Sequence, residues 1–179
     1  MIDVDKIVLD LRKHLKWYIL LDFINVHRMY SNVCFSLDIR CNFPEYISET
    51  IVLLYLQNLK KLNPVKGNVG DLYIPSLNLR IEVKAFSSIG PSSFGTTEKW
   101  DILYFVDATA FSLNRYKIYE VSLTNEEFNL VLVNKKETFG DQIKNKRRPR
   151  ISFDNLMKQP YFSSKTQLVF NGDFINLKR

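Results

Sequence analysis

The chain has 179 residues, a length typical of one domain and sufficient to bury a sizeable core. Apolar residues make up 46% and charged residues 25%, and these ordinary globular proportions argue against a disordered chain. The net charge of +6 suits a polyanionic partner, although a basic balance alone does not demand one.

The scarcity of histidine and cysteine limits the available chemistry. His14 and His27 are the only histidines, and their spacing to Cys34 and Cys41 matches no usual zinc-ligand pattern. The same scarcity argues against His-dependent nuclease chemistry and against a Ser-His-Asp hydrolase. With no signal peptide, the two cysteines are expected to be reduced thiols in a cytoplasmic, non-secreted protein, for which a prokaryotic or viral origin fits.

Two further functional classes are not supported. The apolar run over residues 17–24 is too short to cross a membrane and is interrupted by Asp22. No Gly-rich phosphate loop of the Walker type is present, so no NTP-driven activity is predicted.

Residues 5–23 place apolar side chains at helical spacing, which predicts an amphipathic first helix. This helix either packs on the core or forms a dimer surface, and the pattern does not choose between the two. Residues 25–42 carry few periodic signals, and the alternation across residues 33–39 predicts a strand or an extended arm.

A second helix is predicted over residues 45–62, because Pro44 suits a first turn and strongly apolar positions follow it. Glu49 lies within this apolar stretch, where a buried carboxylate needs a partner. The alternative is an exposed Glu49 near the helix start, a position that the helix dipole favours.

The chain is organised around residues 70–85, which form two β-rich segments on either side of Pro75-Ser76-Leu77-Asn78. This order predicts a hairpin with a tight turn. With Ser76-Leu77 as its loop, Ile74 pairs with Leu79. Polar and apolar residues alternate in the second segment, so one face of the hairpin is apolar and the other is charged.

In this register Asp71 lies opposite Glu82, and Lys84 shares the same face. Bringing two carboxylates and an ammonium together there is energetically costly unless a divalent cation compensates the negative charge. Carboxylate oxygens suit Mg²⁺ or Mn²⁺, which keep positions for water and phosphate oxygens. A lysine beside such a metal can orient or deprotonate the attacking water. The alternative is an amphipathic hairpin with a solvated charged face.

These residues resemble the PD-(D/E)xK nuclease superfamily, with Asp71 as its first acid and Glu82-Val83-Lys84 as its E-x-K motif. Gly70 stands where the motif's name has proline, and glycine is compatible with the same turn. The resemblance implies a core of a helix, an antiparallel catalytic hairpin and a strand alongside. It also implies Mg²⁺, or Mn²⁺ in its place, at Asp71 and Glu82. In this superfamily the helix before the hairpin often supplies an extra acid, and Glu49 matches that position.

The segment from residue 86 to residue 100 is rich in Gly, Pro and hydroxyl side chains, so no regular element is predicted. A flexible linker is one interpretation. A DNA-contacting loop is the other, because hydroxyls donate to phosphates and base edges. An E-x-K strand that runs into a Ser/Gly-rich segment and then Lys-Trp-Asp also resembles restriction enzymes of the superfamily. The hydroxyl residues predicted to contact DNA are Ser87, Ser88, Ser92, Ser93, Thr96 and Thr97.

Regular elements are predicted again from residue 101 onward. Residues 101–108 form a nearly continuous apolar run, typical of a central strand covered on both faces. A strand is predicted over residues 116–123 and a helix over residues 124–133. The C-terminus is predicted to form two edge strands, residues 167–170 and residues 174–177, around a turn.

Much of the basic excess lies between residues 135 and 150, where Pro149 argues against a regular helix. A short helix is predicted over residues 154–158. A basic loop beside a capped helix N-terminus is typical of a phosphate-binding site. Alternatively, Arg147 or Arg148 would bond to guanine in the major groove with two guanidinium nitrogens, which would make this a loop that determines sequence specificity. Nuclear localisation and a solvated, disordered loop are the other interpretations. The basic residues predicted to contact DNA are Lys144, Lys146, Arg147, Arg148 and Arg150.

These elements together predict an α/β fold, one domain over residues 1–179 with a mixed central β-sheet and an antiparallel catalytic hairpin flanked by helices. The predicted function is that of a Mg²⁺-dependent, sequence-specific endonuclease on double-stranded DNA, a type II restriction enzyme. A homodimer is expected by analogy, because such enzymes pair to cut both strands of a palindrome. The alternatives are a structure-selective nuclease of the junction-resolvase or repair type and a non-catalytic basic DNA-binding domain.

Overall fold

The computed structural model describes residues 4–39, 42–67, 70–88 and 90–178. The chain divides into two compact units, Met1–Cys41 and Asn42–Arg179. The α-helices are α1 (Val4–Ser36), α2 (Glu45–Leu54), α3 (Asn125–Phe128), α4 (Phe139–Lys144), α5 (Phe153–Met157) and α6 (Pro160–Ser164). The strands are β1 (Val65–Lys66), β2 (Leu72–Ile74), β3 (Leu79–Phe86), β4 (Ser92–Ser93), β5 (Ile102–Asp107), β6 (Tyr116–Val121), β7 (Arg150–Ile151) and β8 (Thr166–Gly172).

The first unit contains one long helix, α1, which continues well past the predicted end at residue 23. Large apolar side chains of its second half are exposed, among them Met29, Val33 and Phe35. The choice between packing on a core and forming a dimer surface therefore stays open. Cys41 lies outside the described residues, so the prediction of two reduced thiols is untested there.

The strand or extended arm predicted over residues 33–39 is wrong, because α1 runs on to Ser36 and ends in a backbone cap. Asp38 adopts a left-handed φ of 53°, and the Ile39 amide donates to the Cys34 carbonyl over 2.8 Å. This pattern is the Schellman motif, which satisfies carbonyls of the last helical turn. The alternating side chains that predicted a strand therefore belong to the last turn of a helix and its cap.

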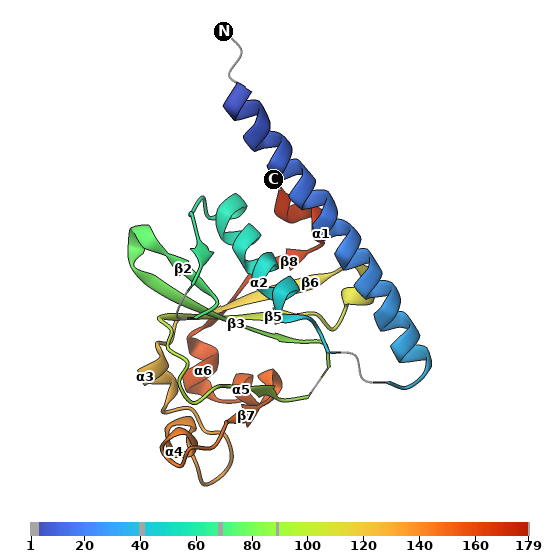
Figure 1. Cartoon of the computed structure of the whole chain (residues 1–179). Coiled ribbons are helices and arrows are strands. Elements are labelled where there is room, and N and C mark those ends of the chain that lie inside the picture. The colour runs from blue at the N-terminus through green and yellow to red at the C-terminus, as the bar shows by residue number, and fades with distance from the viewer. Residues whose placement is uncertain (1–3, 40–41, 68–69, 89, 179) are drawn as a thin grey trace. The chain divides into compact units, whose positions relative to one another are not determined.

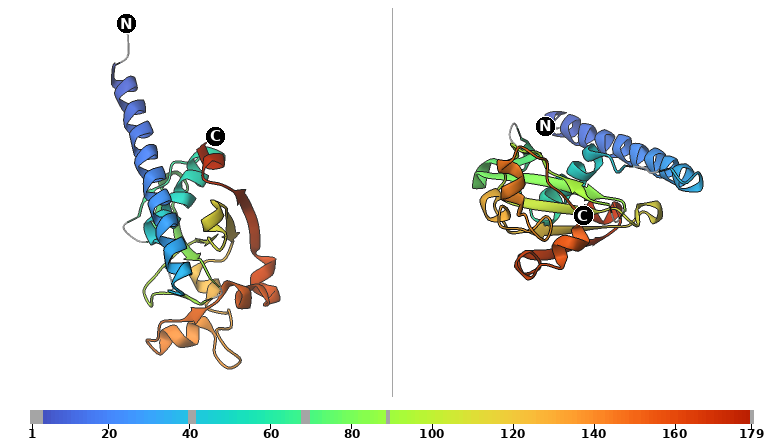
Figure 2. Two further views of the ribbon diagram at one scale, coloured as in Figure 1. Left: turned by 90° about the vertical axis from the view of Figure 1, so that its right-hand side faces the viewer. Right: turned by 90° about the horizontal axis from the view of Figure 1, so that it is seen from below.

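The second unit is built on a six-stranded sheet in the order β1-β2-β3-β5-β6-β8 (Figure 1). β3 and β5 pair in parallel, and the other neighbours pair antiparallel. Helix α2 lies on one face of the sheet, whereas α5 and α6 lie toward the other (Figures 1 and 2). The predicted mixed α/β sheet with flanking helices is confirmed, and β5 is the predicted central strand.

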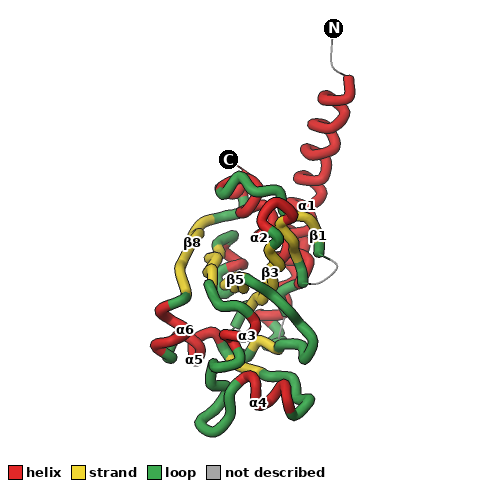
Figure 3. The backbone as a smooth tube through the Cα atoms, turned by 90° about the vertical axis from the view of Figure 1, so that its left-hand side faces the viewer, coloured by secondary structure: helices red, strands yellow, loops and turns green. Residues whose placement is uncertain are grey.

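The side chains of β5 alternate between the two faces of the sheet. Tyr104 contacts Tyr55, just after α2, with ring centroids 6.2 Å apart. Leu103 and Phe105 belong to the opposite, largely aromatic core. The fully buried rings of that core include Phe94, Trp100, Phe128, Phe139 and Phe162. Loops, short helices and short strand segments make up the part of the unit around α3 and α4 (Figure 3).

Phe94 comes from the Gly- and Pro-rich segment that follows β3. Its ring centroid lies 5.3 Å from that of Phe128 and 5.2 Å from that of Phe139. Trp100, at the end of the same segment, is also buried and donates from Nε1 to the Leu123 carbonyl over 3.1 Å. The segment is therefore anchored to the core at both places, and its interpretation as a flexible linker is wrong.

The predicted helices differ from the observed ones mainly at their ends. α2 passes into a π-helical turn, Tyr55–Leu59, so the helix stops short of the predicted residue 62. Thr124 caps α3 with a capping box as its position suggests, yet α3 ends at Phe128 rather than continuing to residue 133. The predicted helix over residues 154–158 is confirmed as α5. Neither α6 nor α4 was predicted, and α4 forms in the basic stretch where no regular helix was expected, because the Thr138 capping box begins it and it ends at Lys144, before Pro149.

The C-terminal pair of edge strands is only half correct. β8 pairs with β6 along its length, but the strand predicted over residues 174–177 is wrong, because Ile175–Lys178 is a 3-10 helix. The Asn176 amide donates to the Asp173 carboxylate over 2.9 Å, and the Asn58 side chain donates to the Leu177 carbonyl over 2.6 Å. The Asp173 bond is local and the Asn58 bond is long-range, and together they satisfy backbone groups that a strand partner would otherwise have bonded. Among the described residues, no helix has the length and apolar character needed to cross a membrane.

Candidate active site

The predicted hairpin forms in the predicted register. Ile74 pairs with Leu79, and a 3-10 turn, Pro75–Leu77, connects the two strands. Asn78 closes the turn with a left-handed φ of 52°, a conformation that asparagine tolerates better than most residues. The strand pairing ends at Leu72 and Ile81, so Asp71 and Glu82, the next residue on each side, lie just beyond the last pair.

Gly70 sets the direction in which the chain enters β2. Its φ is +79°, and a Cβ atom at this position would lie 3.0 Å from the Ile81 carbonyl oxygen. The next residue, Asp71, donates its amide to the same carbonyl over 3.0 Å. Glycine is therefore required here by both conformation and space, in the place where the motif's name has proline.

Asp71 lies where β2 separates from β3. Its Oδ2 accepts a hydrogen bond from the Val83 amide over 2.7 Å, in the position where a continued β2 would have bonded. Burial raises the pKa of Asp71 although this amide opposes the shift, and the charges of Glu49 and Glu98 raise it further. The Asp71 side chain therefore satisfies a backbone amide of β3 that β2 leaves unpaired, and it lies near two other carboxylates.

Glu82 and Lys84 project from the same face of β3. Glu82 is 3% exposed, and its Oε1 lies 2.5 Å from the Lys84 ammonium. Burial raises the pKa of Glu82 to about 7, against the attraction of Lys84. Burial lowers the pKa of Lys84, but the charges and hydrogen bonds of Glu82 and Glu98 outweigh it, so the pKa lies above its ordinary value. The structure thus brings together the three residues of the predicted motif.

Glu98 belongs to the same group and was not predicted from the sequence. Its Oε1 lies 3.2 Å from the Lys84 ammonium, which also stands 5.4 Å from the centroid of the Phe94 ring. Glu98 follows the Ser/Gly-rich segment, and no motif spacing relates it to the hairpin. Its place beside Lys84 depends on how that segment folds back over β3.

Glu49 reaches the site region from α2. Its Oε2 lies 2.5 Å from the Lys66 ammonium on β1, and its side chain is 17% exposed. It is close enough to Asp71 to raise the pKa of that carboxyl. Glu49 is therefore a half-buried, paired carboxylate near Asp71, and its predicted contact with a metal stays a prediction.

The donor set suits a hard divalent cation, because all of its acidic groups are carboxylates. Asp71 lies near enough to Glu82 for its charge to raise the pKa of Glu82, and these two carboxylates are the pair that would hold such an ion. No three His, Cys, Asp or Glu side chains of the described ranges are gathered closely enough to hold one together. The predicted trio with Glu49 is therefore not assembled in this conformation, in which Lys66 and Lys84 pair with Glu49 and Glu82.

A family model described as Bsp6I restriction endonuclease matches residues 14–159. The chain belongs to this family. The type II restriction enzyme Bsp6I of Bacillus sp. (strain RFL6) is 36% identical over 113 residues, an alignment that spans only 62% of this chain and 62% of that enzyme. No solved structure matches the chain significantly.

In this Bsp6I-family chain, two segments that were separately predicted to contact DNA join in a small antiparallel ribbon. Ser92 of β4 pairs with Ile151 of β7, and Ser93 pairs with Arg150. The Phe94 amide extends the pairing by donating to the Pro149 carbonyl over 3.0 Å. The Ser/Gly-rich segment and the end of the basic stretch therefore form one surface feature.

The predicted hydroxyl contacts differ in their exposure. Ser88, Thr96 and Thr97 are exposed, and Ser87 and Ser93 are half-buried. Ser92 is 8% exposed, and its Oγ is buried without a hydrogen-bond partner among the described residues. Ser92 therefore points into the protein, whereas the others of the set remain at or near the surface.

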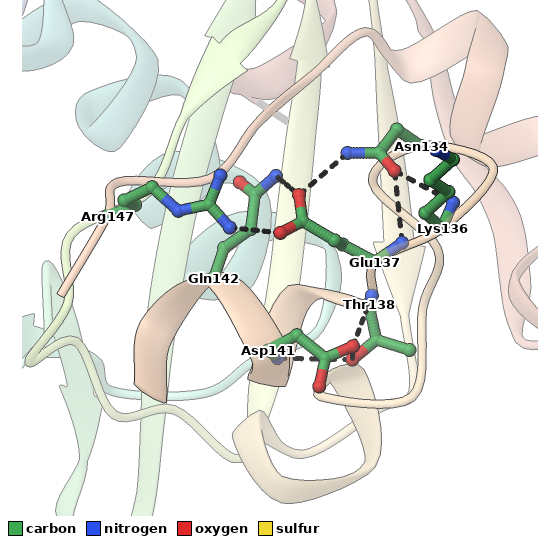
Figure 4. Close-up of polar contacts among 7 residues, drawn as sticks. All are labelled: Asn134, Lys136, Glu137, Thr138, Asp141, Gln142 and Arg147. Carbon is green, nitrogen blue, oxygen red and sulfur yellow. Dashed lines mark hydrogen bonds and ion pairs between the residues drawn. The ribbon is translucent and has the colours of Figure 1, made fainter. Parts of the chain in front are cut away.

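The basic stretch is held by a network around Glu137 (Figure 4). The Glu137 carboxylate accepts from the Arg147 guanidinium and from the amides of Asn134 and Gln142. The Arg147 bond, followed by those from Asn134 and Gln142, lowers the pKa of Glu137 to about 2. The interpretation of this stretch as a disordered loop is therefore wrong.

The other basic residues of the stretch are arranged around this network. Lys144 ends α4, and Lys146 follows with a left-handed φ of 55°. Arg148 donates from Nε to the Phe94 carbonyl over 3.5 Å, which links it to the ribbon. Lys144, Lys146, Arg148 and Arg150 are all exposed. Arg147 is exposed as well, but its guanidinium is paired with Glu137, whereas no ion pair engages Arg148 or Arg150 among the described residues.

Proposed function

We propose that this chain is a divalent-metal-dependent endonuclease that cleaves double-stranded DNA at a specific sequence, a type II restriction enzyme of the PD-(D/E)xK class. The observation that carries the proposal is the convergence of Asp71, Glu82 and Lys84 at the open edge of β3, in a chain of the Bsp6I family. Bsp6I is described as a type II restriction enzyme, and this chain is 36% identical to it over 113 residues.

Asp71 and Glu82 would hold Mg²⁺, or Mn²⁺ in its place, and Glu49 would approach as a third acid after parting from Lys66. A bound divalent cation polarises the phosphodiester and makes its bound water a better nucleophile. Lys84 keeps a positive charge beside that position, where it orients the water and offsets charge that develops on the phosphate. In-line attack with departure of the 3′ oxygen leaves 5′-phosphate and 3′-OH ends.

DNA contact is assigned to the ribbon of β4 and β7 and to the exposed basic residues beside it. The net charge of +6 supports binding to a polyanion. A homodimer would place two such sites on the two strands of a palindrome, because a twofold axis relates both the protein copies and the DNA half-sites. We expect the enzyme to act in the cytoplasm.

The proposal is tested with Asp71→Asn and Lys84→Ala, each assayed on plasmid DNA with Mg²⁺ and with EDTA. Each variant should cut more slowly by about 10²–10⁴-fold while it binds DNA in EDTA as tightly as the unchanged chain. Glu126→Gln is the matched control, because Glu126 is an exposed carboxylate on α3. Either variant cutting at the unchanged rate would overturn the assigned roles.

The products separate the alternative functions. Discrete fragments from linear DNA indicate sequence specificity, whereas preferential cutting of four-way junctions indicates a structure-selective nuclease. Retained DNA binding with no cutting in Mg²⁺ or Mn²⁺ would identify a non-catalytic DNA-binding domain.

A further inference from the structure

Lys84 carries an ammonium with three N–H donors on a flexible stem. Two of its partners are carboxylates from different parts of the chain, Glu82 at 2.5 Å and Glu98 at 3.2 Å. The side chain of Lys84 is 16% exposed and that of Glu98 is 22% exposed. The contact is therefore largely shielded from water, where an ion pair is stronger than on an open surface.

When two N–H groups of the Lys84 ammonium bond to Glu82 and Glu98, the direction of its third N–H is fixed as well. The Phe94 ring lies 5.4 Å from Nζ and limits the space available on its own side. Glu82 is also a proposed ligand of the cation, and a carboxylate that binds a cation attracts a neighbouring ammonium less strongly. Glu98 stands on a separate segment, so its hold on Lys84 does not depend on Glu82.

The segment that carries Glu98 is fixed at both ends by buried aromatic side chains. Phe94 and Trp100 are 0% and 1% exposed. The Asp101 amide donates to the Arg80 carbonyl over 2.9 Å, which ties the end of the segment to β3. Glu98 therefore approaches Lys84 from a rigid support, as a group that positions another group requires.

Gly95 provides the space that the Glu98 carboxylate occupies. A Cβ atom at residue 95 would lie 2.7 Å from Oε1 of Glu98, the same oxygen that contacts Lys84. An alanine at residue 95 would therefore displace the Glu98 side chain. This relation supplies a way to move Glu98 without changing it.

We propose that Glu98 is a positioning residue that holds the Lys84 ammonium toward the reacting phosphate. In this proposal Gly95, which has no side chain, leaves the space that the Glu98 carboxylate occupies. The inference rests on the proposed catalytic role of Lys84. Glu98 touches neither DNA nor the reacting atoms in this role and acts only through Lys84. The structure thus assigns a function to a carboxylate outside the D…E-x-K motif.

The test compares Glu98→Ala, Glu98→Gln and Gly95→Ala on plasmid DNA that the unchanged chain cleaves, with Mg²⁺ and enzyme in excess. Glu98→Ala should lower the single-turnover rate by about 10–100-fold, the usual effect of losing an orienting partner. Glu98→Gln, which keeps an oxygen acceptor, should recover part of the rate. DNA affinity in EDTA and the thermal unfolding midpoint should not change in either variant. Glu126→Gln again serves as the matched control.

Two combined variants separate positioning from a structural role. Gly95→Ala should lower the rate, but it should add nothing to Glu98→Ala, because the clash needs the Glu98 side chain. Glu98→Ala should likewise add nothing to Lys84→Ala. Without metal, Lys84 should react faster with an amine-acylating reagent in Glu98→Ala, as followed by peptide mass spectrometry.

Three results would overturn the inference: an unchanged rate in Glu98→Ala, a loss confined to DNA affinity or stability, or an equal loss when Lys84 is already absent. An unchanged rate in Lys84→Ala would instead overturn the proposed active site, and the positioning role with it. The two failures are therefore distinguishable.

Discussion

At the scale of single residues, Glu137 determines how the basic stretch is held. Its carboxylate pairs with Arg147, and its pKa falls from 4.5 to about 2 on folding. The folded state therefore binds fewer protons than the unfolded chain between these two values. Its contribution to stability is complete above pH 4.5 and is lost as the pH falls toward 2.

We therefore predict that Glu137→Gln lowers the free energy of unfolding at neutral pH, and that its difference from the unchanged chain disappears near pH 2. Urea unfolding at a series of pH values measures this difference. Arg147→Gln is the matched control and should give a smaller loss that also fades at low pH, because Asn134 and Gln142 still bond Glu137. It should add no loss to Glu137→Gln in the double variant. A difference that is the same at every pH would show that the ion pair contributes nothing.

The residues of the candidate active site were predictable to different degrees. Asp71 and Glu82 follow from strand alternation and turn chemistry, because a hairpin brings opposite positions together whatever surrounds it. Glu98 was not predictable, because nothing local relates residue 98 to Lys84. Its position follows from the burial of Phe94 and Trp100, and sequence pattern does not show which core those rings enter.

At the scale of elements, the segment between β3 and β5 is held mainly by Phe94. Its ring is fully buried and meets four other aromatic rings, those of Trp100, Phe105, Phe128 and Phe139. Phe94→Ala should lower the free energy of unfolding by about 3–5 kcal/mol, because it leaves a cavity in a packed core. Leu130→Ala, at a side chain 67% exposed, should change it by less than about 0.5 kcal/mol. Equal effects in urea titrations would contradict this packing.

The ribbon of β4 and β7 gives a second prediction at this scale. Arg150 is exposed on β7, whereas Arg147 is paired with Glu137. Arg150→Gln should weaken DNA binding and reduce the slope of log affinity against log salt by about 1, as the loss of one phosphate contact does. Arg147→Gln should change the slope less. Filter binding in EDTA over a range of salt concentrations measures both, and the reverse order would remove β7 from the DNA surface.

The two segments wrongly predicted as strands share one cause. The end of α1 and the 3-10 helix at Ile175–Lys178 are both short apolar stretches that alternation reads as strands. The first is decided by the local backbone cap at Asp38. The second is decided by a local bond to the Asp173 carboxylate and by a long-range bond from Asn58, neither of which alternation shows. β5 was predictable because a long apolar run leaves no comparable local alternative.

At the scale of the whole molecule, cleavage of both strands is expected to need two copies of the chain. We predict that unchanged chains mixed and refolded with excess Asp71→Asn chains convert supercoiled plasmid mainly to the nicked form, because mixed dimers hold one working site. Gel analysis of the products over time measures this, and sedimentation confirms the dimer. The unchanged protein alone should give linear DNA. Linear product from every mixture would instead indicate that one chain cuts both strands.

The run of chain between β3 and β5 has a practical consequence for engineering. It carries Ser88, Thr96 and Thr97 on its surface, and within the same few residues Glu98 contacts Lys84 in the space that Gly95 leaves. Grafting this loop whole from a relative of different specificity would therefore exchange the target site and disturb turnover together. Libraries that randomise the surface hydroxyls while retaining Gly95 and Glu98 are the better route to a new cutting site.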